Sequence, residues 1–544
     1  MLSVAWRHSS DIISRPEEPT SMKLDRLNEY VLATTVLVVG IVVAIACGRF
    51  AGSGENFWIW SIAAGVVYVV TCLTMRMQVW LLIPMFWSCA GQLNSVPLHL
   101  PLRDLVVGGV LLYFLTLKAF KVARSKATYG WLDAIMFANV IYIIFVYMRY
   151  PIGVNALGSD MVGGRAYAEV AFAVAGYWIL NQVSMPAAMA RIFPLLLCAV
   201  GTFFAVVDTI TYLFPATVPI LGKLYSGIDA ESFKRDLSDQ EADVSEGDLR
   251  TEFLANVGGT IINLMSSYFS PLTFINPMYI WRFLGILIAL IFCLKSGHRI
   301  TVPAVAITIL MATYFRKGFA AVIIMVLIGI PPLLLIIAGQ GRLYNLPESA
   351  QRTLCFLPGE WDPGVKLNAQ GSTEWRLQMW DIMLHDDKYI QDKVFGDGFG
   401  FSREDMIRMA LSDSQDNFMA ANMPHSGPVS TIRVAGFAGL GLFLILLFAC
   451  SVRSWRLIRA TKGGPFYPIS LFVGIQTIYS SFGFVVIFGD FKNDLPNMIL
   501  NVGILNLLQK SFDEYRKSIE NAPLPPKPVR AARPLSPMPV PALH

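Results

Sequence analysis

The sequence predicts an all-α, polytopic integral membrane protein, and three observations support this class. First, 55% of the 544 residues are hydrophobic and only 15% are charged, whereas soluble domains carry roughly 25% charged residues. Second, apolar stretches of about 17 to 25 residues, long enough to cross a bilayer as a helix, recur along most of the chain. Third, the loops between these stretches differ systematically in charge.

Thirteen stretches are apolar enough to be membrane spans. In chain order they are 30–48, 57–75, 78–96, 104–121, 131–149, 166–183, 191–213, 278–295, 300–315, 318–338, 429–451, 467–488 and 493–509. A further candidate, Phe253 to Thr273, is only weakly apolar and contains two asparagines and two glycines. Small and polar residues suit a span that faces other helices rather than lipid.

Clusters of lysine and arginine indicate which loops are cytoplasmic. They occur before the first span, after the fourth, before the span 467–488, and in the C-terminal tail. If all are cytoplasmic, the number of spans is even, which requires the weak segment Phe253 to Thr273 to cross as well. We therefore predict about 14 spans, within a range of roughly 12 to 14. The net charge of +5 reflects these loops, so no nucleic-acid partner is expected.

The spans and charges divide the chain into five parts. The segment 1–29 lacks the apolar core of a signal peptide, and the tail 510–544 is rich in proline and expected to be disordered. An acidic stretch near 214–252 becomes an outer loop, which we interpret as a solvated surface. The predicted parts are a cytoplasmic segment 1–29, a transmembrane bundle 30–338, a large periplasmic loop 339–428, C-terminal transmembrane helices 429–509 and a cytoplasmic tail 510–544.

The large loop contains one helical pattern and one turn. Trp375 to His385 has the spacing of an amphipathic helix, with Ser372 as its N-cap. Its apolar side is expected to lie on the membrane surface and consists of Leu377, Trp380, Ile382 and Met383. The sequence GDGFGF, Gly396 to Phe401, predicts a turn. Because no strand precedes it and no further glycine pair follows, nucleotide binding is not expected.

Three residues around the loop have side chains suited to chemistry on an anion. Arg299 lies at the outer edge of a span, where its guanidinium suits phosphate oxygens; the alternative is a helix-end arginine that snorkels. Arg376 lies in the predicted loop helix, where it is alternatively a surface partner of Glu374. His425 precedes the span 429–451, where it either exchanges a proton near neutral pH or has a structural role.

The sequence contains no pattern for a metal or a bound cofactor. The seven cysteines have no CxxC or Cys/His spacing, and we interpret them as packing residues. His425 has no second histidine or cysteine at metal-ligand spacing. We therefore expect neither a metal site nor a cofactor.

In this order the motifs resemble those of the O-antigen ligase and O-antigen polymerase superfamily, whose members are membrane glycosyltransferases with a GT-C type fold. A span ends near SGHR (Ser296 to Arg299), and after two more spans come STEWRLQMW, GDGFGF, Pro424-His425-Ser426 and a glycine-rich span. The resemblance covers about residues 250–451. Two places depart from the family pattern: Ser426 replaces an asparagine, and Ser296 to Arg299 replaces a tighter Ser-Arg-Gly.

The resemblance implies a function and a set of site residues. Arg299 and Arg376, with Arg250 as a weaker candidate, would bind the diphosphate of an undecaprenyl-diphosphate-linked glycan, and His425 and Arg376 would be catalytic. The implied reaction is metal-independent glycosyl transfer to a glycan or to the lipid A core. It would take place at the outer face of the bacterial inner membrane, and the resemblance does not distinguish a ligase from a polymerase.

Two other classes of function stay open on the sequence. A lipid-linked glycan flippase or another transporter usually places ionisable groups in the middle of its spans. Here the spans are nearly free of charge and the polar residues gather in the outer loop. A membrane sensor or scaffold would use the loop as a binding module, but no cytoplasmic effector domain is recognisable. These observations favour the enzyme.

Overall fold

The structure, a computed structural model, describes residues 57–89, 101–120, 127, 129–151, 163–217, 252–402, 404–407, 414–486 and 488–521. Within these residues every regular element is a helix, which confirms the predicted all-α class. The segment 1–29, the predicted span 30–48, Arg250 and most of the acidic loop 214–252 lie outside the described residues.

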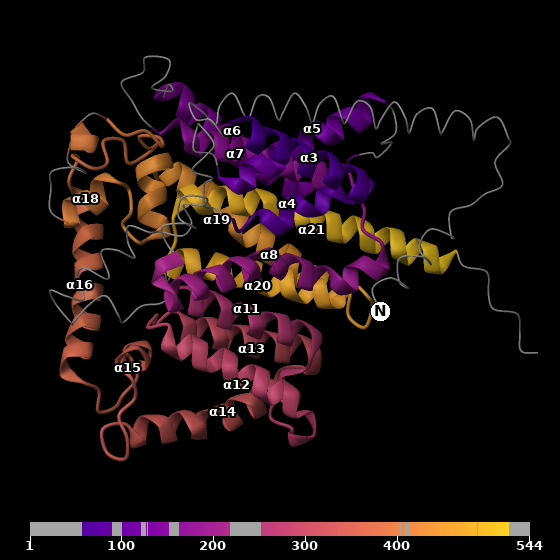
Figure 1. Cartoon of the computed structure of the whole chain (residues 1–544). Helices are drawn as coiled ribbons and strands as arrows, with labels where there is room; N and C mark the ends of the chain where they lie inside the picture. The colour runs from indigo at the N-terminus through magenta and orange to yellow at the C-terminus, as the bar shows by residue number, and fades with distance from the viewer. Residues whose placement is uncertain are drawn as a thin grey trace, which may run out of the picture.

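Long helices occupy most of the predicted spans (Figure 1). The short η2 (Arg76–Leu81) and α4 (Leu82–Phe86) stand where the predicted span 78–96 begins. The long helices are α3 (Phe57–Met75), α5 (Leu102–Ala119), α6 (Trp131–Arg149), α7 (Gly164–Leu180), α8 (Ala187–Leu213), α11 (Glu252–Tyr268), α12 (Ile280–Lys295), α13 (Thr301–Lys317), α14 (Phe319–Gly339), α19 (Gly427–Ala460), α20 (Tyr467–Val486) and α21 (Phe491–Glu520).

The apolar helices are those of a membrane-embedded protein. Five described helices are long and apolar enough to cross a membrane: α6, α14, α19, α20 and the Ala187–Phe204 part of α8. A sharply bent pair, Gly65–Met75 with Gln78–Phe86, qualifies when its two halves are taken together. Helices α7, α11, α12 and α13 are 16 or 17 residues long and pack beside them in the same bundle.

The weak segment near Phe253 to Thr273 forms α11, a helix packed among α8, α12, α13 and α20. Its glycines serve close packing, because a Cβ on Gly258 would lie 2.6 Å from the Cys293 sulfur and 2.7 Å from the Ala289 carbonyl oxygen of α12. At its other end, Arg316 of α13 donates a 3.1 Å hydrogen bond to the Ser266 carbonyl oxygen. A Cβ on Gly285, near the start of α12, would lie 3.0 Å from the Met265 sulfur near the end of α11, so the two helices run antiparallel. The even number of spans stays a prediction.

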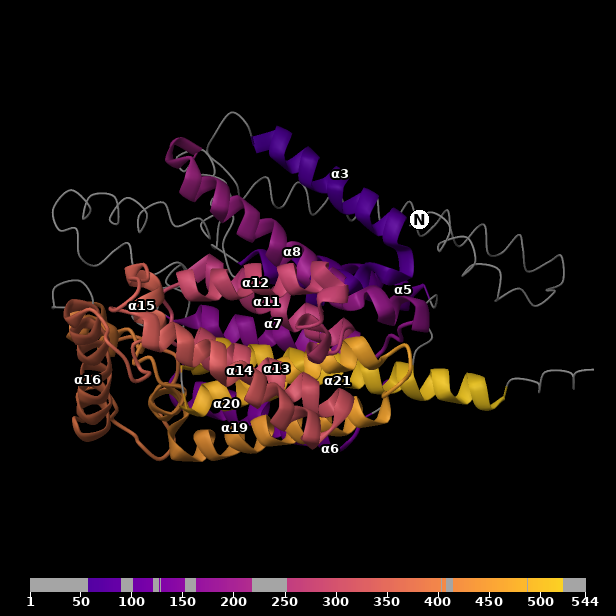
Figure 2. The same ribbon diagram turned by 90° about the horizontal axis from the view of Figure 1, so that it is seen from below.

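One end of the bundle is covered by the large loop (Figures 1 and 2). The loop contains α15 (Glu348–Leu354), α16 (Pro363–His385) and α18 (Ser414–Ala420), and α16 lies across the ends of the bundle helices. Ion pairs gather at the same end. The Arg103 guanidinium donates to Glu169 at 2.8 Å, and Arg149 donates to Asp392 of the loop at 2.6 Å.

The loop has its own hydrophobic core, which corrects two predictions about α16. Met383 is fully buried in a cluster with Met379, Met419 and Ile432, so it does not lie on the membrane surface. Ser372 lies inside the helix and does not cap it. The N-cap is Asp362, which accepts from the Gly364 amide at 2.8 Å, and Pro363 at the first helical position suits a helix start.

The C-terminal tail begins later than predicted. Helix α21 continues to Glu520, so the first residues of the predicted disordered tail are helical. Its extension packs on the loop between α19 and α20: the rings of Phe512 and Tyr515 lie 6.2 and 5.7 Å from the Phe466 ring. Phe466 is fully buried, so this apolar contact orders the helix beyond the predicted span.

Candidate functional site

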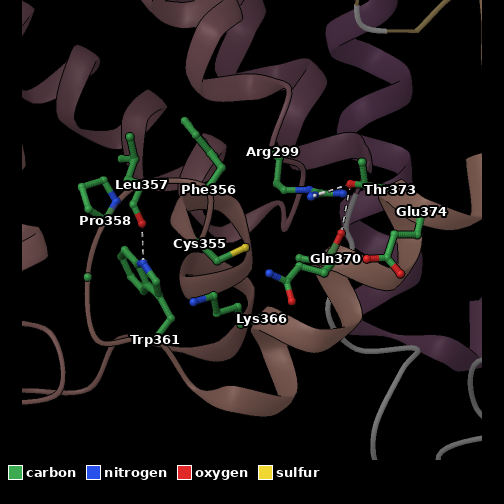
Figure 3. A pocket seen from close by; sticks show the side chains of 12 residues that line it. Arg299, Cys355, Phe356, Leu357, Pro358, Trp361, Lys366, Gln370, Thr373 and Glu374 are labelled. Carbon is green, nitrogen blue, oxygen red and sulfur yellow. Dashed lines mark hydrogen bonds between the residues drawn. The ribbon is translucent and has the colours of Figure 1, made fainter. Parts of the chain in front are cut away.

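Arg299 reaches α16 from the turn between α12 and α13. Gly297 has φ +70° there, a conformation that glycine adopts at little cost. Thr301 donates to the His298 carbonyl oxygen at 2.7 Å and closes the turn. The Arg299 guanidinium, held on this rigid turn, donates to the Thr373 hydroxyl of α16 at 3.3 Å (Figure 3).

A pocket of about 460 Å³ opens beside this contact. Figure 3 shows Arg299, Cys355, Lys366 and Gln370 around it, with Glu374 at its edge. Two cations and one carboxylate line it, so its net charge is positive. Its polar groups suit a phosphorylated ligand, since both a guanidinium and an ammonium bind phosphate oxygens.

A third cation lies close behind the pocket wall. Arg352 of α15 is only 3% exposed. Burial raises the pKa of the Cys355 thiol, and the positive charges of Arg299, Arg352 and Lys366 oppose that shift. The three cations therefore act on one small volume. Neither Arg352 nor Lys366 was predicted from the sequence. For Lys366 the reason is that only a helix start at Asp362-Pro363 places it on the face of Thr373.

Arg376 follows Thr373 by three residues on α16 and is half-buried. Side chains three apart on a helix are neighbours, with Cβ atoms about 5–6 Å apart. Arg299 touches Thr373, so the structure brings Arg299 to within about one helical turn of Arg376. Residues distant in the sequence thus supply two guanidinium groups to the same stretch of α16.

His425 is held against the same helix. It has φ +52°, which is uncommon for a residue with a side chain and marks a constrained turn. The Trp380 indole of α16 donates to the Pro424 carbonyl oxygen at 2.7 Å. The imidazole lies among three rings, with centroids 5.2 Å away for Phe488, 5.4 Å for Phe418 and 6.2 Å for Trp375. The ring is thus fixed at the start of α19, where Ser426 is the N-cap.

Helix α19 is broken at Gly436, and the GDGFGF turn fills the break. Gly436 has φ +64° and ψ −176° inside an otherwise helical segment. In a continuous helix Phe437 and Ala438 would donate to the carbonyl oxygens of Arg433 and Val434. Instead, Phe437 donates to Lys393 at 2.8 Å and Ala438 to Val394 at 3.1 Å.

The freed carbonyl oxygens find partners in the same turn. Arg433 accepts from the Asp397 amide at 2.8 Å, and Val434 accepts from the Gly398 amide at 2.9 Å. Residues 393–398 therefore replace both missing helical bonds with four backbone bonds of their own. The prediction of a turn at GDGFGF is confirmed, with φ +81° at both Gly396 and Gly398, and the turn anchors the loop to the bundle.

Two aspartates stabilise this turn. Asp392 accepts from the amides of Val394 and Phe395, both at 2.9 Å. The Phe395 amide, and then the Arg149 guanidinium, hold the pKa of Asp392 below its usual value. Asp397 accepts from the amides of Gln391 and Asp392 at 2.8 and 2.9 Å. Hydrogen bonds to backbone amides explain the positions of both carboxylates, so we propose neither aspartate as a catalytic residue.

Arg433 is a second arginine that the sequence analysis missed. It is 5% exposed and donates to the carbonyl oxygens of Met419 and Ala420, both at 2.7 Å. These carbonyls end α18, where a cation also interacts favourably with the helix dipole. Arg433 thus joins α18 to α19 and supports the turn that carries His425.

Arg299 and the His425 turn therefore both contact α16, the helix that carries Arg376, but of the three only Arg299 lines the pocket. Arg250 lies outside the described residues. Within the described part of the chain, no group of three or more His, Cys, Asp or Glu side chains has the arrangement of a metal site. No protein-family model matches the chain, and no curated protein is similar to it in sequence. The fold and the site define an all-helical membrane protein with a cationic pocket and an enclosed histidine at one end of its bundle.

Proposed function

We propose that this protein is a membrane glycosyltransferase that transfers or polymerises a glycan from an undecaprenyl-diphosphate carrier. One observation carries the proposal: Arg299 meets α16 at Thr373, one turn before Arg376, and the His425 turn is bound to the same helix through Trp380. A diphosphate needs concentrated positive charge, and glycosyl transfer needs a proton acceptor close to it. One helix presents both.

In the proposed reaction the acceptor hydroxyl oxygen attacks the anomeric carbon of the donor sugar. The bond from that carbon to the diphosphate breaks, and the lipid diphosphate leaves with the electron pair. His425 takes the proton of the hydroxyl. Arg299 and Arg376 stabilise the charge that develops on the diphosphate, a role that a divalent cation has in other enzymes.

The proposal includes a topology. The chain crosses the bacterial inner membrane about 12 to 14 times, with both termini cytoplasmic and the loop 339–428 periplasmic. The positive-inside bias of the other loops supports this orientation. The contacts of Arg149 and Arg299 with the loop support only that the end of α6 and the turn after α12 lie on the same side as the loop. The acceptor, a growing glycan or the lipid A core, would approach at that end.

Reconstitution of the purified full-length protein with an undecaprenyl-diphosphate-linked glycan tests the proposal. Arg376→Gln and His425→Gln should each lower the rate of glycan transfer by about 100-fold or more. Arg342→Gln and His385→Gln are matched controls, because these exposed residues of the same loop pair with Glu360 and Asp381. Transfer at the control rate in both site variants would overturn the proposal.

Lys366→Gln separates binding from chemistry. Lys366 lines the pocket away from the His425 turn, so its loss should raise the KM for the lipid-linked donor about tenfold and leave kcat within about twofold. A variant with an unchanged KM would show that the donor does not occupy this pocket.

The break in α19 is an observation that favours the alternative, a flippase or another transporter, since transporters use discontinuous helices to bind their substrates. In such helices the freed backbone groups face the substrate, whereas here they pair with residues 393–398. Accumulation of the lipid-linked donor on the cytoplasmic face of a deletion strain would favour transport. Accumulation on the outer face would favour the transferase.

A further inference from the structure

A second pocket, of about 410 Å³, lies at the opposite end of α13 from Arg299. It is formed where α13 ends, α14 begins and α19 ends. Tyr314, Phe315 and Phe319 supply aromatic walls, and Arg459 and Lys462 supply positive charge. Since α13 has 17 residues, about 25 Å of helix separates this pocket from the Arg299 site. It is therefore independent of the proposed active site.

Within the described part of the chain, no salt bridge compensates the positive charge of this pocket. Both Arg459 and Lys462 are exposed, and neither forms a salt bridge with any residue that the structure describes. The sequence contains no Asp or Glu from 311 to 320 or from 451 to 470. Arg316 does not contribute, because it turns away and donates to the carbonyl oxygens of Ser266 and Ser267. Clustered positive charge near the surface of a membrane attracts anionic lipid headgroups.

Trp455 does not itself line the pocket, but it contacts three residues that do. The Trp455 ring lies 4.6 Å from the Phe315 ring and 5.4 Å from the Tyr314 ring. The Arg459 guanidinium lies 5.9 Å from the Trp455 ring, within the range of a cation–π contact. Trp455 therefore connects two of the aromatic walls of the pocket to the Arg459 guanidinium.

An apolar stripe continues from the pocket along α14. Phe319, Ile323 and Leu327 are spaced four residues apart, so they lie on one side of the helix. Their exposed fractions are 68%, 47% and 63%. A ligand with a phosphate group and a long hydrocarbon chain would match both features, since the cations lie at the head of this stripe.

We propose that this pocket binds one anionic phospholipid, its phosphate on Arg459 and Lys462 and an acyl chain along the stripe of α14. The basic cluster that contains both residues is predicted to be cytoplasmic, so the lipid would come from the inner leaflet. Phosphatidylglycerol meets these requirements, whereas phosphatidylcholine has a compensating positive charge on its headgroup.

Native mass spectrometry of the full-length protein in detergent, titrated with each lipid, tests the site. Wild type should bind phosphatidylglycerol at least fivefold more tightly than phosphatidylcholine, and the double variant Arg459→Gln/Lys462→Gln should lose that preference. Arg456→Gln is the matched control, because Arg456 is exposed on the same helix end but does not line the pocket. The control should keep the preference within about twofold of wild type.

Three further outcomes decide the proposal. Equal preference for phosphatidylglycerol in wild type and the double variant would overturn it. Displacement of the lipid by inorganic phosphate at the same concentration would show that the site recognises free phosphate, and would also overturn it. Phe319→Ala should weaken the binding of long-chain phosphatidylglycerol more than that of its dihexanoyl analogue. An equal effect on both lipids would show that the acyl chain does not lie along the stripe of α14.

Discussion

The break in α19 leads to a prediction that can be worked out from the structure. Gly436 has φ +64°, and a Cβ there would lie 2.1 Å from the Val394 carbonyl oxygen and 2.4 Å from the Phe395 amide nitrogen. Real Cβ atoms do not approach backbone so closely, so Gly436→Ala must move the turn 393–398 out of the break. The matched control is Gly441→Ala on the same helix, where a Cβ meets no described atom within 4 Å.

The cost follows from the hydrogen bonds. Four backbone bonds join the turn to the break, and each contributes about 1 kcal/mol net. Alanine at this combination of φ and ψ, which essentially only glycine adopts, costs about 1–3 kcal/mol more. If the variant restores a continuous helix, it regains the two helical bonds and avoids the backbone strain, which leaves a loss of about 2 kcal/mol. The expected destabilisation of the docked turn is therefore about 2–7 kcal/mol.

Hydrogen exchange of the full-length protein in nanodiscs measures this directly. Peptides that contain residues 393–398 should exchange at least roughly 30-fold faster in Gly436→Ala, since about 1.4 kcal/mol corresponds to a factor of ten. Gly441→Ala should exchange like wild type in these peptides, because it changes neither partner. Equal protection of 393–398 in the two variants would refute the view that the turn fills the break.

Three further predictions concern the groups that position the loop. Trp380→Phe removes the bond to the Pro424 carbonyl oxygen, which contributes about 1 kcal/mol, and should lower the transfer rate several-fold at an unchanged protein level; an unchanged rate would contradict this. Since the pKa of Asp392 is lowered, its stabilisation of the turn is complete above about pH 4 and is lost as the pH falls through the lowered value. In wild type, hydrogen exchange of residues 393–398, corrected for intrinsic exchange rates, should become faster as the pH falls through this value. The same acceleration in Asp392→Asn would disprove the role of Asp392. Arg433→Met leaves the Met419 and Ala420 carbonyls unpaired and should lower the Tm, and a Tm equal to that of wild type would contradict this.

The helices of the bundle could be predicted because their signal is local. An apolar stretch of suitable length predicts α6 at Trp131–Arg149 without knowledge of its neighbours. The weak segment that became α11 was found from the charges of loops elsewhere, since its own composition is ambiguous. Its asparagines and glycines are explained only by the structure, where Gly258 allows α12 to approach.

The site could be predicted only in part, because its geometry depends on contacts between distant residues. The motifs led to Arg299, Arg376 and His425, and the structure places Arg299 and the His425 turn against α16, the helix of Arg376; their roles stay predictions. Lys366 was missed because the helix start was placed near Ser372. An Asp at the N-cap followed by Pro is the stronger signal, and it extends the helix by three turns toward the pocket.

The break in α19 was beyond sequence reasoning for a different physical reason. A single glycine in an apolar helix usually continues it, at a cost of about 1 kcal/mol. Breaking the helix at Gly436 becomes favourable only because residues 393–398, about forty positions earlier, offer two donors and two acceptors at matching places. Gly436 and the turn at residues 393–398 can each be identified in the sequence, but the hydrogen bonds between them cannot be predicted from it.

This pairing also explains how a large polar loop that is covalently joined to the bundle only at its two ends can be held in place against it. A continuous α19 would satisfy its own backbone groups and leave the loop attached through side chains. The broken helix instead forms four backbone hydrogen bonds with the loop at Gly436. The segment Gly427–Ala435 connects this break to His425. Trp380 bonds to Pro424, next to this segment, and Thr373 bonds to Arg299, so both ends of the connection lie on α16. Displacement of the turn 393–398 should therefore disturb the pocket beside Arg299 and His425 together. Variants of Gly436 should therefore impair donor binding as well as turnover, although no atom of Gly436 belongs to either site.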